Sequence, residues 1–187
     1  MVLYFENKIQ YNFDFETTTL AHLNRYPNPY AKHVLSVDTL DSHIDKEGQL
    51  NITRIIVKTG RLPKFVRPFL GSTNLNSWII EKLIINPKTK TMKSYTSNID
   101  HRKFIRIEEF LNFQTDKSLL NLIECNAKVK FSSNLIGLKS KIEEWSHQKF
   151  SKNINNSRDG LTYVMNKMKE KGKYYFIKKN MNNGLGV

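Results

Sequence analysis

Alternation of apolar and polar residues along most of the chain limits its possible folds more than any other feature. The clearest stretch places apolar residues at every second position: Ile123, Cys125, Ala127, Val129 and Phe131. A period of two is typical of a strand with one buried and one exposed face. Residues 9–15, 33–37, 52–58 and 105–113 alternate in the same way, and a turn joins an apolar run over residues 75–85 to residues 91–99. Together with residues 123–131, these segments predict seven strands.

Turns and helices complete the prediction of an α+β fold. Residues 45–48 and 86–90 suit hairpin turns, and strands in hairpin order predict an antiparallel sheet. Residues 17–19 offer N-caps for a short helix that the two following prolines end, and residues 137–170 lack proline and predict one long helix. A sheet of this size covered by two helices could curl around an unfilled interior that holds a ligand, although a solid core fits the pattern equally well.

The length and charge of the chain set broad limits on its organisation and partners. A length of 187 residues fits one domain, which we expect to span residues 1–171, followed by a disordered basic tail over residues 172–187. Lys and Arg number 30 against 17 Asp and Glu, which gives a formal charge of +13. This charge favours an anionic partner such as a nucleic acid or an acidic lipid surface, although a solvated lysine-rich surface would have the same composition.

Cysteine usage and hydropathy exclude several classes of protein. The single cysteine, Cys125, excludes an internal disulfide and a cysteine-rich zinc site, and its alternating context indicates a core residue. No apolar run approaches the ~20 residues that cross a bilayer. The first residues include Glu6, Asp14 and Glu16 and lack the features of a signal or transit peptide, so we expect no cleaved presequence.

Lys149 interrupts an apolar face of the predicted C-terminal helix. Leu138, Ile142 and Trp145 follow helical spacing, and the next positions on that face are Lys149 and Asn153. An unpaired buried ammonium is costly, so Lys149 should meet an internal carboxylate or an anionic ligand. A second apolar stripe allows the alternative that the helix buries this stripe and lets Lys149 reach water: Phe150, Ile154, Leu161, Met165 and Met168.

Three further basic residues adjoin apolar strand faces or the end of the first helix. Lys58 shares a strand face with two isoleucines, His33 shares one with Leu35 and Val37, and Arg25 lies where the first helix should end. Each alone is more typical of a sheet edge or of a polar group with an internal partner. Several together would hold a phosphate, because one cation about 4 Å away contributes roughly 4 kcal/mol at an effective dielectric constant of about 20.

Residues 60–71 break the strand pattern between two glycines. Basic residues and prolines intersperse this segment: Arg61, Pro63, Lys64, Arg67 and Pro68. Its apolar residues recur at helical spacing: Leu62, Phe65, Val66, Phe69 and Leu70. The prolines exclude a long regular helix. A loop of this kind suits a lid or an insertion into an anionic membrane surface, and a connector packed on the sheet is the alternative.

Catalytic motifs are not evident. Glu108 and Glu109 are neighbours on one predicted strand and therefore point to opposite faces, and Asp100 and His101 lie near a turn. The sequence has no glycine-rich phosphate loop, metal-spaced histidine cluster or nucleophile elbow. We therefore expect a protein that is not an enzyme and that uses no cofactor and no metal.

A set of short motifs lies at residues 24–29, 33–38, 58, 60, 62–63, 78, 81, 92–93, 95–96, 98, 130–133, 144–146, 149–150 and 153. In these motifs the sequence resembles the PRELI/MSF family, and within it the fungal Ups-type branch of phosphatidic acid carriers of the mitochondrial intermembrane space. The resemblance covers residues 1 to about 168. Arg25 before Tyr-Pro-Asn-Pro is similar to the phosphatidic acid branch, whereas Phe65 departs from the tryptophan that is common in the family.

The resemblance implies a fold and a set of site residues. The fold is START-like, with a curved seven-stranded antiparallel sheet, a long C-terminal helix, a short N-terminal helix and a lid loop that together enclose a lipid cavity. The implied headgroup residues are Arg25, His33, Lys58, Lys149 and Asn153, with Arg61 near the mouth. The implied lid and membrane contacts are Leu62, Pro63, Lys64, Phe65, Val66, Arg67, Phe69 and Leu70.

The resemblance also implies a function and a location. The protein would extract phosphatidic acid and shuttle it between the mitochondrial outer and inner membranes, which supports cardiolipin synthesis. It would lie in the intermembrane space, peripheral on the inner membrane, with a small helical twin Cys-x9-Cys protein as heterodimer partner. Its other partners would be an anionic phospholipid and, transiently, an anionic membrane surface. A basic nucleic-acid-binding domain is the alternative, which the resemblance does not favour.

Overall fold

A computed structural model describes residues 2–61, 74–102, 105–116, 122–133 and 139–172. Its elements in chain order are β1 (Val2–Tyr11), α1 (Phe15–Leu23), β2 (Val34–Ile44), β3 (Leu50–Arg61), β4 (Asn74–Asn86), β5 (Thr91–Asn98), β6 (Arg106–Thr115), β7 (Ile123–Ser132) and α3 (Lys139–Lys171). All seven predicted strands and both predicted helices are present. The predicted lid, residues 62–70, and nearly all of the predicted tail lie outside the described residues.

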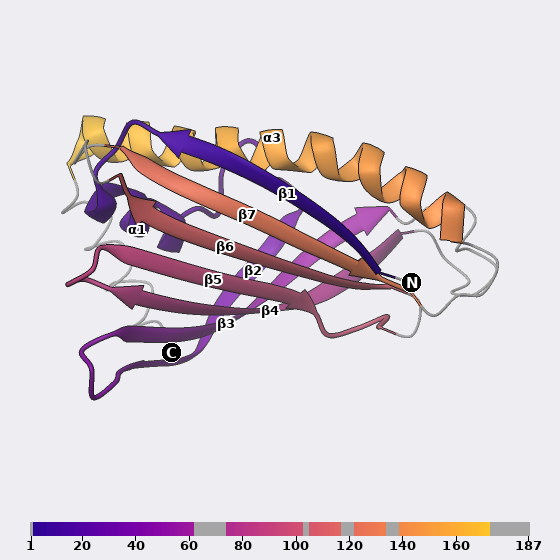
Figure 1. The fold of residues 1–187 in the computed structure, drawn as a ribbon, viewed down its shortest axis with the longest axis horizontal. Helices are drawn as coiled ribbons and strands as arrows, with labels where there is room; N and C mark the ends of the chain where they lie inside the picture. The colour runs from indigo at the N-terminus through magenta and orange to yellow at the C-terminus, as the bar shows by residue number, and fades with distance from the viewer. Residues whose placement is uncertain (1, 62–73, 103–104, 117–121, 134–138, 173–187) are drawn as a thin grey trace.

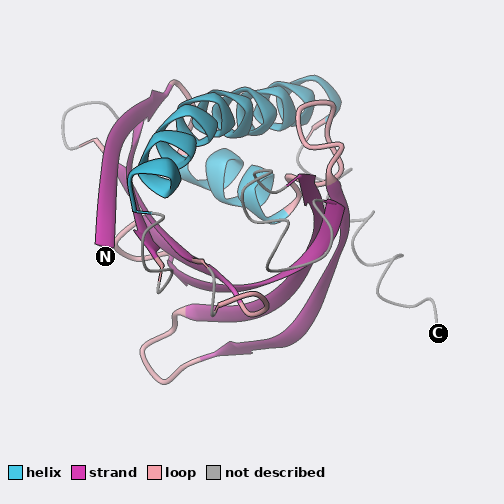
Figure 2. Cartoon of the chain, turned by 90° about the vertical axis from the view of Figure 1, so that its right-hand side faces the viewer, coloured by secondary structure: helices cyan, strands magenta, loops and turns pink. Residues whose placement is uncertain are grey.

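The strands form one antiparallel sheet in the order β1-β7-β6-β5-β4-β3-β2. Neighbours in sequence are neighbours in the sheet from β2 to β7, as hairpin connections require, and β1 then pairs with β7 along its whole length. The sheet curls, and its concave face wraps around α1 and α3 (Figures 1 and 2). The predicted curved sheet is therefore confirmed.

Three local predictions were wrong in detail. The first strand is Val2–Tyr11 and does not extend over residues 9–15, because Phe13 lies beyond β1 and Phe15 begins α1. The N-cap of α1 is Asp14, not a threonine: the amide and hydroxyl of Thr17 both donate to its carboxylate, at 2.8 and 2.6 Å. His33 does not share a strand face with Leu35 and Val37, because register shifts interrupt β2 between Val34 and Ser36. The extra residue of this bulge leaves Leu35 exposed.

A polar row crosses the concave face from strand to strand. We define it as Arg54, Glu81, Thr96 and Glu109, which lie directly opposite one another on β3, β4, β5 and β6. Because strand side chains alternate between faces, every second residue on either side of this row also faces inward. The row therefore divides the concave face into two halves.

The half between the row and the β2–β3 and β4–β5 turns is the hydrophobic core, and we call it the closed half. Its inward strand residues are buried: Ile9, Tyr11, Ile52, Leu83, Ile85, Met92, Phe113, Ile123 and Cys125. The C-terminal part of α3 covers them with Leu161, Val164, Met165 and Met168. Cys125 is a core residue as predicted, with 1% of its surface exposed.

The half beyond the row, which we call the open half, is packed less completely. Leu3, Ile79 and Ile107 face inward there but are only half-buried. Ile56 and Phe131 are buried but do not belong to the core cluster of the closed half. The same strands thus carry a solid core at one end and a looser apolar surface at the other.

The described side chains of α3 favour the second of the two predicted stripes. Ile154, Leu161, Met165 and Met168 are buried, whereas Lys149 and Asn153 are exposed. Trp145 is half-buried. The helix thus turns its second stripe to the core and Lys149 away from it. In the described part of the chain, no helix combines the length and apolarity that crossing a membrane requires.

Candidate ligand-binding site on the concave face

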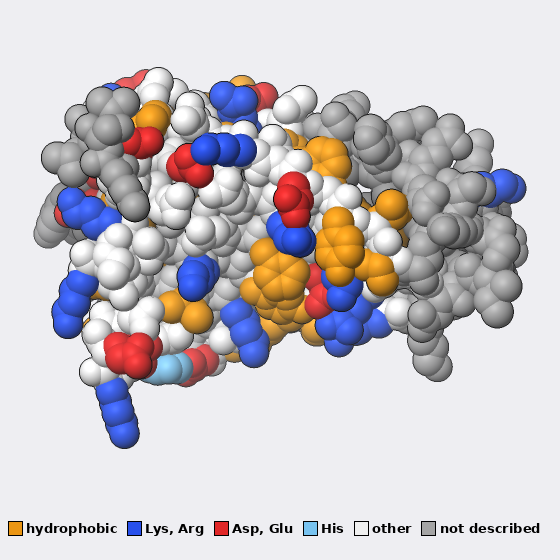
Figure 3. Space-filling model, in the orientation of Figure 1, with side chains coloured by type: hydrophobic (Ala, Val, Ile, Leu, Met, Phe, Trp, Pro, Cys, Tyr) orange, Lys and Arg blue, Asp and Glu red, His pale blue; other side chains and the backbone are white. Residues whose placement is uncertain are grey.

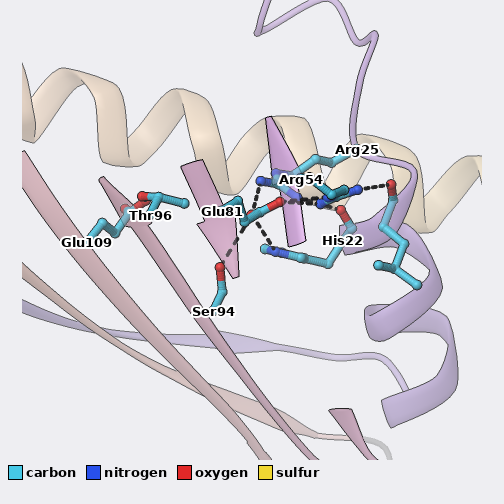
Figure 4. A network of polar contacts seen from close by, with 8 residues as sticks. His22, Arg25, Arg54, Glu81, Ser94, Thr96 and Glu109 are labelled. Atoms are coloured by element: carbon cyan, nitrogen blue, oxygen red, sulfur yellow. Dashed lines mark hydrogen bonds and ion pairs between the residues drawn. The ribbon is translucent and has the colours of Figure 1, made fainter. Parts of the chain in front are cut away.

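Glu81, on β4, is a fully buried carboxylate that two arginines bind (Figure 4). Arg54 lies directly across on β3, and its Nε and Nη2 atoms donate to Oε2 of Glu81 at 2.8 and 2.5 Å. Arg25, just after α1, donates from Nη2 to Oε1. Ser94 donates to the same oxygen at 3.3 Å, and Nε2 of His22 lies 3.5 Å from it. We call these five residues the Glu81 cluster.

The same two arginines also hold the end of α1. Arg25 donates from Nη1 to the carbonyl of His22, and Arg54 donates from Nη1 to the carbonyl of Leu23, each at 2.8 Å. Carbonyls in the last turn of a helix lack helical partners and form the negative end of its dipole, so cations stabilise them. The cluster therefore fixes α1, and the segment after it, against the sheet.

The charges in the cluster are well defined at neutral pH. Burial raises the pKa of Glu81, but Arg25, His22 and Arg54 outweigh it and hold that pKa well below its ordinary value. Burial, followed by the charge of Arg25, lowers the pKa of His22 to about 4. With two guanidinium groups, one carboxylate and a neutral imidazole, the cluster carries one net positive charge.

Tyr26 connects the cluster to Lys58. The guanidinium of Arg25 lies 4.7 Å from the centroid of the Tyr26 ring, and Nζ of Lys58 lies 6.0 Å from it. Burial raises the pKa of Tyr26, but Lys58 and Arg25 outweigh it and lower that pKa. Lys58 is half-buried and has no ion-pair partner among the residues that the structure describes. It is a cation of the open half that forms no ion pair with a described carboxylate, although its charge acts on the carboxyl of Glu109 from a distance.

His33 and Lys149 lie within electrostatic range of one another, and Lys58 lies within range of His33. Partial burial, then the charges of Lys58 and Lys149, lower the pKa of His33. The carbonyl of His33 accepts a hydrogen bond at 2.8 Å from the amide of Thr59, next to Lys58. His33, just before β2, therefore lies within electrostatic range of two other predicted site residues, Lys58 on β3 and Lys149 on α3.

The other predicted site residues have different surroundings. Arg25 binds Glu81 and a helix carbonyl, so the structure gives it an internal partner as well as proximity to Lys58. Asn153 is exposed on α3. Arg61 is the last residue of β3, and its side chain lies outside the described part of the structure, as do all the predicted lid residues.

Sequence reasoning did not identify Glu81, Arg54 or His22 as members of a site. The sequence pattern could have identified Arg54, because Arg54 alternates with Ile52 and Ile56 and must therefore face the apolar side of its strand.

The prediction that Glu108 and Glu109 point to opposite faces of one strand is confirmed. Glu108 faces outward and binds Tyr95 and Arg106, whereas Glu109 accepts a hydrogen bond from Thr96 on the concave face. Among the described residues, no three His, Cys, Asp or Glu side chains gather as metal ligands would.

Solved structures with a similar fold share little sequence with this chain. TTHA0849 from Thermus thermophilus superposes with a TM-score of 0.57 at 11% identity, covering 87% of this chain and 97% of that one. The Zhui aromatase/cyclase from a Streptomyces species gives a TM-score of 0.55 at 6% identity, covering 90% of this chain and 96% of that one. These similarities establish the START-like fold alone.

Sequence relatives cover almost the whole chain. The protein is 43% identical to "Protein UPS1, mitochondrial" of Saccharomyces cerevisiae, over 91% of this chain and 97% of that protein. It is 37% identical to "Protein ups1 homolog" of Schizosaccharomyces pombe, over 85% and 92% respectively. Human "PRELI domain-containing protein 1, mitochondrial" is 27% identical over 90% of this chain and 77% of that protein. Residues 16–171 match the PRELI-like family, and the chain therefore belongs to it.

Proposed function

We propose that this protein is a lipid transfer protein that extracts phosphatidic acid from one membrane and shuttles it between the mitochondrial outer and inner membranes, supporting cardiolipin synthesis. Its membership of the PRELI-like family and the mitochondrial names of its relatives support this function. The observation that carries it is Lys58, a half-buried cation on the open half of the concave face, whose charge acts, like that of Lys149, on His33.

The physical requirements of lipid extraction favour this half of the sheet. Two acyl chains of about 30 methylenes cost on the order of 20–25 kcal/mol to remove from a bilayer, so the carrier must bury them again. The incompletely packed residues Leu3, Ile79 and Ile107 offer apolar surface for this purpose. Lys58 lies at the border of that surface, where it would meet the phosphate.

The remaining parts of the proposal concern partners and location. We place the protein in the intermembrane space, peripheral on the inner membrane, as the heterodimer partner of a small helical twin Cys-x9-Cys protein. The predicted lid, residues 62–70, would contact the anionic membrane surface. We expect the lipid to leave chemically unchanged, because the buried carboxylate of Glu81 is held by Arg25 and Arg54.

A nucleic-acid-binding function requires basic residues gathered on an exposed face. On the face shown in Figure 3, Lys and Arg side chains are instead scattered among acidic and apolar ones. Lys128, for example, is paired with Glu6 at 2.8 Å on this outer side of the sheet. This distribution does not favour the alternative.

The test is phosphatidic acid transfer between liposomes, measured with the partner present. Lys58→Met removes one inward charge, and we expect at least a tenfold slower transfer. Lys82→Met is the matched control: Lys82 lies on the opposite face of the sheet from Glu81, its neighbour on β4, and is exposed, so its loss should change transfer little. Absence of transfer by the wild-type protein would refute the proposed function.

A salt series separates the half-buried lysine from the exposed one. We expect the Lys58→Met deficit to persist as salt increases, because partly buried charges are weakly screened. Lys149 is exposed, so we expect the deficit of Lys149→Met to shrink at high salt. A Lys58→Met deficit that disappears with salt would place Lys58 at the membrane surface and not at the headgroup.

A further inference from the structure

The polar row ends in a second inward-facing carboxyl, that of Glu109. The register places Thr96 opposite Glu81 and Glu109 opposite Thr96. Val129, which is buried, lies opposite Glu109 on β7, so the next strand presents no polar group. Figure 4 shows Glu109 beside Thr96 and apart from the Glu81 cluster. Two acids therefore share one row of the concave face in different surroundings.

Glu109 lacks the partners that Glu81 has. The hydroxyl of Thr96 donates to its Oε2 over a long distance, 3.4 Å. In the described part of the chain, no basic side chain forms an ion pair with Glu109, whereas two arginines bind Glu81. The side chain of Glu109 is only half-buried, yet burial raises the pKa of its carboxyl. This combination is expected for a carboxyl that faces a partly enclosed space.

Charged groups on several elements act on Glu109. After burial, the largest influences are Lys58 on β3 and Arg25 after α1, which lower its pKa, and Glu81 on β4, which raises it. The net shift is upward, so the two cations do not compensate for the loss of water. Glu109 in turn contributes, after burial, to the raised pKa values of two other groups, Tyr11 on β1 and Cys125 on β7.

We propose, on the basis of the function proposed above, that Glu109 is a specificity-determining residue of the lipid site, whose carboxyl must be protonated when an anionic phosphate headgroup binds beside Lys58. An ionised Glu109 and a bound phosphate are two anions that compete for the same cation. With the phosphate in place, an ionised Glu109 would keep only the long hydrogen bond from Thr96 and the influence of Arg25, which Glu81 already binds.

Because proton binding and lipid binding are thermodynamically coupled, this competition predicts that the protein takes up protons as it binds the lipid. A ligand that favours the protonated form of a group binds more weakly as the pH rises, by up to about tenfold per pH unit while the group must take up a proton. Loading should therefore take up to one proton per lipid at Glu109, and release should return it. Thr96 would hold the protonated carboxyl in place, because its hydroxyl lies on the same row.

The experiment is calorimetric titration of the full-length protein, with its partner, against soluble dihexanoyl phosphatidic acid at pH 7. Buffers of different ionisation enthalpy report the protons taken up on binding. The comparison is between the wild type and Glu109→Gln, which keeps the size of the side chain but cannot titrate. Because both proteins bind the same lipid, the ionisation of its phosphate cancels. Glu108→Gln, on the outward face, is the matched control.

We expect the wild type and Glu108→Gln to take up the same number of protons, and Glu109→Gln to take up measurably fewer, by up to one proton per lipid. Between pH 6 and 8 the affinity of Glu109→Gln should fall less steeply than that of the wild type. Glu109→Leu, which suits the apolar wall, should match Glu109→Gln. Binding with equal proton uptake in all proteins overturns this inference alone. Absence of binding by the wild type overturns the proposed lipid site and this inference with it.

Discussion

The closed and open halves of the concave face are built from the same strands but differ in packing. On β4, Ile85 and Leu83 are almost completely buried, whereas Ile79, beyond the polar row, is half-buried. On β6, Phe113 has 1% of its surface exposed and Ile107 is half-buried. The closed half supplies the packing that holds the fold together. The open half can therefore keep apolar surface available for a ligand without loss of the fold.

The polar row is the border between the halves, and disrupting it should have the largest effect. Glu81→Gln leaves Arg25 and Arg54 buried without their carboxylate, and we expect it to lower the free energy of unfolding by about 3–5 kcal/mol. Chemical denaturation measures this loss. Glu108→Gln weakens the ion pairs of a buried carboxylate with Arg106 and Lys130, but both cations reach water, so it should cost about 1 kcal/mol. Equal losses of unfolding free energy in the two variants would show that the Glu81 cluster contributes no more to stability than the ion pairs on the outward face.

Two isoleucines on one strand test the difference in packing directly. Ile85→Ala in the closed half should lower the free energy of unfolding by about 2–5 kcal/mol, because it leaves a cavity in a filled core. Ile79→Ala faces the same side six residues away in the open half, and we expect a loss about half as large. Measuring the denaturation of both variants with and without bound phosphatidic acid tests whether the lipid contacts the open half alone. Lipid should increase the loss for Ile79→Ala and leave that for Ile85→Ala unchanged.

Lowering the pH should destabilise the folded protein at the Glu81 cluster, because His22 must then take up a proton. The pKa of His22 is about 4 in the folded protein, against an ordinary value of 6.5. The folded protein therefore binds a proton at His22 more weakly than the unfolded chain does. The stability that His22 contributes is present above pH 6.5 and is lost as the pH falls toward 4. The loss is about 1.4 kcal/mol between pH 7.5 and 5.5.

Urea denaturation at the two pH values measures this effect. His22→Gln should remove about 1.4 kcal/mol of the acid-induced loss, because glutamine does not titrate in this range. His43→Gln is the control, since His43 is exposed on β2 and should leave the slope unchanged. The same pH slope in His22→Gln and the wild type would mean that His22 is not held neutral at the border.

Local patterns determined the secondary structure. Alternation over residues 123–131 and the proline-free segment 137–170 predicted β7 and α3 closely, because the preference for one buried face acts between residues a few positions apart. The bulge after Val34 escaped prediction, because one inserted residue changes which side chains face inward and has no composition of its own. Asp14 was missed as the N-cap because three threonines follow it and can also cap a helix, although aspartate is the stronger cap residue.

By itself, the sequence determined that the chain is an α+β domain with basic residues on apolar faces, and its resemblance to a family supplied the predicted headgroup residues. Only the tertiary structure decided that Arg25 is paired with Glu81 while Lys58 has no described carboxylate partner. Arg25, Arg54 and Glu81 are far apart along the chain: strand register places Arg54 opposite Glu81, and the packing of α1 against the sheet brings Arg25 to them. Charge pairing and burial depend on distances in space, so no local pattern distinguishes a neutralised cation from a free one.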